Sequence, residues 1–124
     1  MIRRPRAADR GQATVELALA LPLLCLLVLA VVQVGVVVRD RLAVQLAARE
    51  AARAAVVAAD PVAAGTPAAQ RAVQLRPLQV RVEASGDTVT VTVTYLEPTD
   101  VPLIGALLPD VEVSATVTMA VEPP

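Results

Sequence analysis

The longest apolar stretch of the chain, Leu17–Val38, contains no charged residue. As an α-helix it would extend roughly 33 Å, at about 1.5 Å per residue, which matches the bilayer hydrocarbon thickness of about 30 Å. A cleaved secretory signal would have a shorter apolar core, of about 7–15 residues, followed by a cleavage site between small residues. Here the charged sequence Arg39-Asp40-Arg41 follows instead. We therefore predict a single transmembrane helix over residues 12–38.

Residues 39–60 are expected to continue this helix beyond the bilayer. The segment Arg39–Ala59 is rich in alanine and contains neither glycine nor proline, so its helix propensity is high. At 100° per residue it separates into a charged stripe and a stripe of small apolar residues. The charged stripe consists of Arg39, Arg49, Glu50 and Arg53, and the apolar stripe of Val44, Ala47, Ala48, Ala51, Ala55 and Ala58. The helix should end at Asp60-Pro61, because proline disfavours a helical conformation of the residue before it.

A second, short helix is predicted over Ala68–Leu75, after a loop that covers Val62–Pro67. Thr66 can cap its first turn, and Pro67 suits the first helical position, where a backbone N–H is not needed. Arg76-Pro77 should end the helix.

From Leu78 onward, apolar residues recur at every second position, which is the period of a strand with one buried face. The inward series are Val80, Val82 and Ala84; then Val89, Val91, Val93 and Tyr95; then Val111, Val113, Ala115, Val117, Met119 and Val121. The turn Ser85-Gly86-Asp87 predicts a hairpin between the first two series. The apolar face of such a sheet needs a cover, which the alanine stripe would supply. The predicted fold class is α+β: a long N-terminal helix, a short helix and a three-stranded antiparallel sheet.

The connection Glu97–Pro109 contains three prolines around an apolar centre. We predict a loop here, with a short helix over Pro102–Leu107. Its apolar part, Val101–Leu108, is a candidate contact surface if it is exposed.

The N-terminal segment Met1–Arg10 carries four arginines against a single acid, Asp9. Pro5 and the lack of apolar periodicity argue against a stable helix there. Positive charge directly before an apolar run keeps that end in the cytoplasm. We therefore expect residues 1–11 to be a basic cytoplasmic leader and residues 61–124 to form a small extracytoplasmic region.

The composition offers little for chemistry at an active site. The chain has no His, and its one cysteine, Cys25, lies in the apolar run, so no internal disulfide and no Cys/His metal site can form. No nucleophile motif or phosphate-binding glycine loop occurs, and the net charge is −1. We expect no enzyme activity, no cofactor and no binding to nucleic acid. The acids of the C-terminal half, Glu83, Asp87, Glu97, Asp100 and Asp110, are interpreted as solvated surface residues.

Glu16 is the acid that needs an explanation, because it lies at the edge of the membrane-length run. A carboxylate at the bilayer centre costs roughly 2.5–3.5 kcal/mol, and less near the interface. One interpretation is that Glu16 simply sits near the helix N-terminus, where an anion is stabilised. The other involves Gly11: cleavage after it would make Gln12 the first residue and Glu16 the fifth.

The sequence Arg10-Gly11-Gln12-Ala13-Thr14-Val15-Glu16, followed by LALALPLL, resembles the N-terminus of type IV pilins and pseudopilins. It is most similar to the TadE-like family of tight-adherence pilus systems. The resemblance implies that a prepilin peptidase, an aspartyl membrane protease, cuts between Gly11 and Gln12. It also implies that Glu16 pairs with the new amino group of a neighbouring subunit. Leu17 follows the acid where major Flp-type pilins commonly have an aromatic residue, which favours a minor pseudopilin or an assembly factor.

By this resemblance the partners are the lipid bilayer, the prepilin peptidase and other pilin-like subunits. The protein would be a single-pass protein of the cell (inner or cytoplasmic) membrane, with its C-terminal region outside. A different interpretation stays open: a signal-anchored membrane protein whose β-region is a binding module unrelated to pili.

Overall fold

The computed structural model describes residues 7–98, 106 and 109–121. In this part of the chain two helices precede three strands: α1 (Ala7–Val56), α2 (Pro61–Ala72), β1 (Leu78–Ser85), β2 (Thr88–Glu97) and β3 (Val111–Ala120). This arrangement confirms the predicted α+β fold. The chain forms two compact units, residues 1–34 and 35–124, and α1 contributes to both.

The first unit consists of the N-terminal part of α1. The helix begins at Ala7, so the prediction that Met1–Arg10 lacks helix is wrong for its last four residues. Two alanines with high helix propensity stand at this start. Pro22 lies inside the helix, which continues past it.

In the second unit, α1 ends at Val56, four residues before the predicted end, and α2 begins well before its predicted start. The Oδ1 atom of Asp60 accepts hydrogen bonds from the backbone N–H groups of Val62 and Ala63, both at 3.1 Å. Asp60 is therefore the N-cap of α2, and Pro61 takes the first position, where a missing N–H costs nothing. The predicted loop Val62–Pro67 is helix instead.

The C-terminal end of α2 is held by Arg76. Its guanidinium donates to the backbone carbonyls of Gln70 at 2.7 Å, Val73 at 3.1 Å and Leu75 at 2.6 Å. These carbonyls would otherwise lack partners at a helix end. The helix thus stops at Ala72, three residues before the predicted end.

The strands form one antiparallel sheet in the order β1-β2-β3. The predicted hairpin is confirmed: Ser85 pairs with Thr88 across a two-residue turn, in which Gly86 has φ +55°. Strand β2 pairs with β3 over its whole length, and the N–H of Val121 adds a hydrogen bond to the carbonyl of Asp87 at 2.6 Å. The helix predicted over Pro102–Leu107 lies outside the described residues, apart from Ala106.

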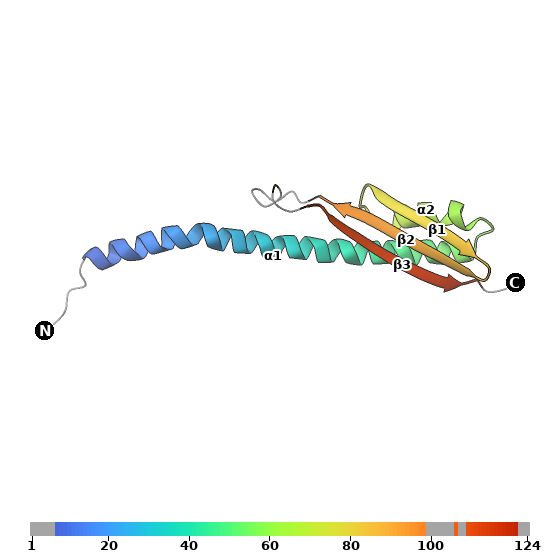
Figure 1. Cartoon of the computed structure of the whole chain (residues 1–124), viewed down its shortest axis with the longest axis horizontal. Coiled ribbons are helices and arrows are strands. Elements are labelled where there is room, and N and C mark those ends of the chain that lie inside the picture. Colours follow the sequence, from blue (N-terminus) through green and yellow to red (C-terminus); the bar gives the residue numbers. More distant parts are fainter. Residues whose placement is uncertain (1–6, 99–105, 107–108, 122–124) are drawn as a thin grey trace. The chain divides into compact units, whose positions relative to one another are not determined.

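The core lies between the sheet and the two helices (Figure 1). The predicted inward series of β2 is buried, and most of the alanine stripe of α1 is fully buried against it; the buried set includes Val44, Ala47, Ala48, Ala51, Ala55, Val89, Val91, Val93 and Tyr95. Ala58 is an exception, because it lies beyond the end of α1 and is partly exposed. The small side chains allow a close approach, most closely at Gly65 of α2. A Cβ at Gly65 would lie 2.9 Å from Cγ2 of Val82 and 3.6 Å from Cβ of Ala55.

The opposite face of the sheet is polar. Threonine hydroxyls pair across β2 and β3, between Thr90 and Thr118 at 2.9 Å and between Thr92 and Thr116 at 3.2 Å. The two faces therefore follow the period-two pattern, with valines toward the helices and hydroxyls toward solvent.

Candidate functional site

The N-terminal segment that the sequence singles out is helical and exposed. The side-chain amide Nε2 of Gln12 donates to Oε1 of Glu16 at 3.0 Å, since positions four apart lie on the same face of a helix. Gly11 comes directly before them, and a Cβ placed on it would meet no atom within 4 Å. The structure thus brings Gln12 and Glu16 together and leaves the Gly11–Gln12 peptide bond on an open helix surface.

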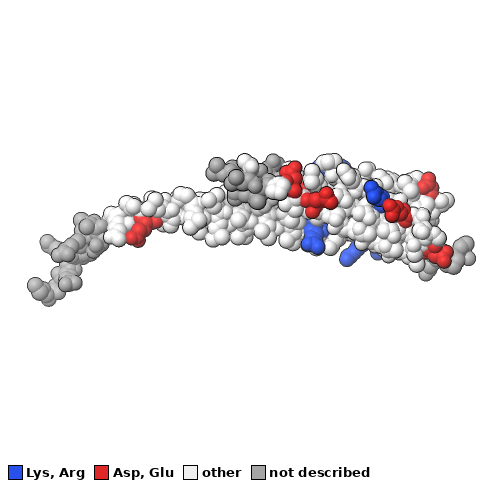
Figure 2. All heavy atoms as spheres, viewed as in Figure 1, with Lys and Arg blue, Asp and Glu red and all other residues white. Residues whose placement is uncertain are grey.

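Beyond Glu16, α1 presents an uncharged apolar surface up to Val38. Its large side chains are exposed in this unit, among them Leu19 at 75% and Leu23 at 72%. None of the most apolar stretch of α1 is buried. In the described part of the chain, α1 is the one helix long and apolar enough to cross a membrane. Figure 2 shows the long uncharged surface that follows the acid near the helix start.

A second group of interacting polar residues lies in the second unit, residues 35–124, which contains the sheet and is called the sheet unit below. Asp40 of α1 is 1% exposed and Glu97, the last residue of β2, is 7% exposed. Nε and Nη2 of Arg39, whose side chain is largely exposed, both lie 3.0 Å from Oδ1 of Asp40. The Oε2 atom of Glu97 is buried and has no hydrogen-bond partner among the described residues.

Burial is the main cause that raises the pKa of Glu97 from its usual 4.5 to about 7. Contact with Asp40, and the negative charge of that residue, raise this pKa as well, whereas Arg39 and Tyr95 oppose the shift. The same surroundings raise the pKa of the Tyr95 hydroxyl, first through burial and then through the charges of Glu97 and Asp40. Near neutral pH, the Glu97 carboxyl is therefore a proton-binding group inside the protein.

The interpretation of Glu97 as a solvated surface acid is wrong. Glu83, Asp87 and Asp110 are exposed as expected, and Asp100 lies outside the described residues. A signal for Glu97 was present: it continues the inward series that ends in Tyr95, two residues earlier. Asp40 precedes the buried Val44 by one helical turn, which places it on the same face of α1.

The described residues contain no group of three or more His, Cys, Asp or Glu side chains arranged to hold a metal ion. Asp40 and Glu97 are two interacting carboxyl groups with little exposure to solvent. Such a pair readily retains one proton, because two adjacent negative charges repel each other. The interaction between these two carboxyl groups links α1, near the start of its part that packs on the sheet, to the end of β2.

These features define a class: a small α+β protein with one apolar N-terminal helix, of the single-pass membrane type. Residues 11–53 match the family model described as "TadE-like protein". The predicted resemblance to the TadE-like family is thereby confirmed for this segment, which includes Gly11, Gln12 and Glu16. No curated protein and no solved structure matches the chain. A TadE-like segment with a single apolar N-terminal helix fits a membrane protein associated with a tight-adherence pilus.

Proposed function

We propose that this protein is a minor pseudopilin or assembly factor of a tight-adherence pilus, made as a precursor that a prepilin peptidase cuts between Gly11 and Gln12. The observation that carries the proposal is the position of Gly11, Gln12 and Glu16 at the head of an uncharged membrane-length helix. This position falls inside the segment that matches the TadE-like family.

In this proposal the basic leader stays in the cytoplasm, in accordance with the positive-inside rule, and the sheet unit lies outside the cell (inner or cytoplasmic) membrane. The Gly11–Gln12 bond lies within α1, so the peptidase must first unwind the end of the helix. Glycine lowers the cost of that step because it is a poor helix former. The open surface at Gly11 gives the enzyme room to approach.

Cleavage would leave an ammonium group on Gln12 beside the carboxylate of Glu16. The side-chain contact between Gln12 and Glu16 would then be replaced by a pairing of Glu16 with the amino group of a neighbouring pilin-like subunit. An ion pair in a low-dielectric environment is strongly attractive, but desolvation offsets most of the gain. Its main effect is therefore to fix the register between subunits and not to add stability.

The first test is the intact mass of the protein extracted from membranes of cells with an active or an inactivated prepilin peptidase. We expect a terminus at Gln12 with the active enzyme and at Met1 without it. A Gly11→Leu variant should keep Met1 in both strains, and Gly35→Ala, a glycine change in the same helix, should be processed normally. A terminus at Met1 in the presence of active peptidase would contradict the proposal. It would favour a plain signal-anchored protein whose β-region is a binding module.

The second test separates cleavage from assembly. Glu16→Ala should leave cleavage and membrane insertion intact but remove the protein from isolated pili, or abolish pilus formation. Glu83→Ala, at an exposed acid of β1 that lies outside α1, is the control and should assemble normally. If Glu16→Ala is incorporated as well as the unaltered protein, Glu16 does not set the register.

A further inference from the structure

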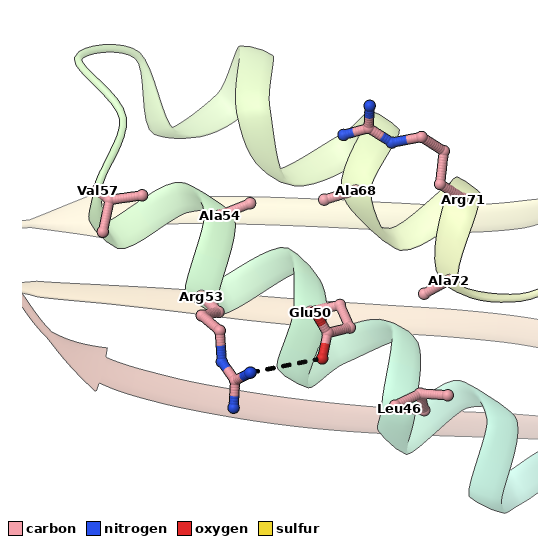
Figure 3. A pocket seen from close by; sticks show the side chains of 8 residues that line it. All are labelled: Leu46, Glu50, Arg53, Ala54, Val57, Ala68, Arg71 and Ala72. Atoms are coloured by element: carbon pink, nitrogen blue, oxygen red, sulfur yellow. Dashed lines mark ion pairs between the residues drawn. The ribbon is translucent and has the colours of Figure 1, made fainter.

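A shallow groove runs between α1 and α2 on the side of the helices that faces away from the sheet. Its volume is about 670 Å³, and eight residues line it: Leu46, Glu50, Arg53, Ala54, Val57, Ala68, Arg71 and Ala72. Figure 3 shows the strands passing behind both helices, with Ala54 of α1 and Ala68 of α2 pointing toward each other. The core lies on the other side of this helix pair, and of the residues that line the groove only Ala72 packs against it.

The residues that line the groove suit contact with another helix. Its floor consists of alanines, which let another backbone approach closely. Leu46 and Val57 stand toward its two ends and are 47% and 85% exposed. Val57 directly follows the last residue of α1, and the helix between Leu46 and Val56 is about 15 Å long, or roughly three turns. A partner helix with apolar residues at positions i, i+4, i+7 and i+11 would contact both of them.

The charges around the groove define the partner further. Arg53 is 75% exposed in its side chain, and its nearest acid, Glu50, is 3.9 Å away, which is a weak contact on one helix face. Arg71 extends from α2 on the other side of the groove (Figure 3). Arg49 adds a further exposed positive charge on α1. Basic side chains therefore flank an apolar floor on both helices.

We propose that this groove binds an acidic amphipathic helix of a partner protein, about three turns long, whose carboxylates lie against Arg53 and Arg71. A second copy of this chain would not supply such a helix. From residue 39 onward, the exposed charged residues of α1 and α2 are five arginines, namely Arg39, Arg41, Arg49, Arg53 and Arg71, and the acid Glu50 is partly exposed. Two copies would therefore repel each other through these surfaces. The inference does not depend on cleavage after Gly11, because the groove lies entirely within the sheet unit.

The test uses the full chain in nanodiscs of neutral lipid and a fluorescent, covalently stapled helical peptide. The peptide carries leucines at the four apolar positions and glutamates beside them, and a twin has lysines in place of the glutamates. Fluorescence anisotropy should show saturable binding of the acidic peptide, at least about tenfold tighter than that of its basic twin. The double variant Arg53→Glu/Arg71→Glu should reverse this preference.

Two further variants make the test specific. Arg81→Glu, at an exposed position on the other face of the sheet, is the charge-matched control and should change neither affinity. Ala68→Leu places a larger side chain in the floor of the groove without a change in charge. It should weaken binding of the acidic peptide by about tenfold. Thermal unfolding followed by circular dichroism checks that each variant folds.

Equal binding of the two peptides, no binding of the acidic one, or an effect of Arg81→Glu as large as that of the double variant would overturn the proposal. Loss of peptide binding when anionic lipid is added to the nanodiscs would also overturn it, because the groove would then bind lipid headgroups. None of these results depends on the position of the mature N-terminus, so they leave the proposed pilus function to its own test.

Discussion

Asp40 and Glu97 form a pair of buried carboxyl groups that joins α1 to the end of β2. Among the residues that the structure describes, Asp40 alone of the two has a basic ion-pair partner, the exposed side chain of Arg39, at 3.0 Å. Glu97 lacks one, and its Oε2 atom has no hydrogen-bond partner among the described residues. The pair therefore avoids two adjacent negative charges by keeping a proton on Glu97, which ties the stability of the sheet unit to pH.

The first prediction is that the stability of the protein falls as pH rises from about 5 to about 8. In this window folded Glu97, with a pKa of about 7, holds a proton that the unfolded chain, with a pKa near 4.5, has lost. Raising the pH therefore favours unfolding, and the stabilisation present below pH 4.5 is lost as pH passes 7. The loss should be on the order of 3 kcal/mol. Chemical denaturation followed by circular dichroism measures it.

The Glu97→Gln variant tests the origin of this pH dependence. Glutamine imitates the protonated carboxyl, so most of the pH dependence should disappear and the variant should be the more stable protein at pH 8. Glu83→Gln, on the exposed side of β1, should keep the full dependence. An unaltered pH dependence in Glu97→Gln would show that another group is responsible.

A second prediction concerns Gly65, where α2 comes closest to the sheet. In Gly65→Ala the new Cβ would lie 2.9 Å from Cγ2 of Val82, so a side chain or the helix must move. Overpacking costs typically 1–3 kcal/mol, whereas alanine gains up to about 1 kcal/mol in helix propensity. We expect a net loss of about 1 kcal/mol in the free energy of unfolding. Adding Val82→Ala should reduce the clash, and Gly35→Ala, which meets no neighbouring atom, should show no such loss.

A third prediction is that α2 depends on its cap. Asp60→Ala removes the acceptor of the hydrogen bonds from Val62 and Ala63, at a typical cost of about 1 kcal/mol. Asp60→Asn keeps a side-chain oxygen in the same place and should retain most of the stability. Unfolding curves of the two variants should therefore separate. If they coincide, the cap contributes little and Pro61 alone positions the helix.

The hairpin turn gives a fourth prediction. Gly86 has φ +55°, a left-handed conformation that costs most other residues roughly 1–2 kcal/mol. Gly86→Ala should lower the midpoint of thermal unfolding. Gly86→Asn should lower it less, because asparagine adopts this conformation more readily. A larger loss in the asparagine variant would mean that the turn is not the source of the effect.

The sheet could be predicted from the sequence because its signal is local. Valines and threonines alternate over the first seven residues of β2, and each valine that the alternation directs inward is fully buried. The alanine stripe could be predicted in the same way, because Val44, Ala47, Ala48 and Ala51 recur at intervals of three and four residues, which is the helical period. Gly11, Gln12 and Glu16 were found through their spacing before an uncharged run.

The start of α2 could not be fixed in this way. Asp60-Pro61 and Thr66-Pro67 both fit the beginning of a helix, and the local pattern does not choose between them. The cap at Asp60, together with the close packing of Gly65 against β1, selects the earlier start. The acid pair was missed for another reason: Asp40 and Glu97 are far apart in the sequence, and their burial follows from the way β2 packs on α1.

Tyr95 has a further consequence for experiments on this protein. It is the only aromatic residue of the chain, since there is no phenylalanine or tryptophan. It lies 8% exposed, beside Glu97. Intrinsic fluorescence and near-ultraviolet absorption therefore come from one side chain at the contact between α1 and the sheet. Every such optical signal reports on that contact alone, and proton release from Glu97 can be followed there without any attached dye.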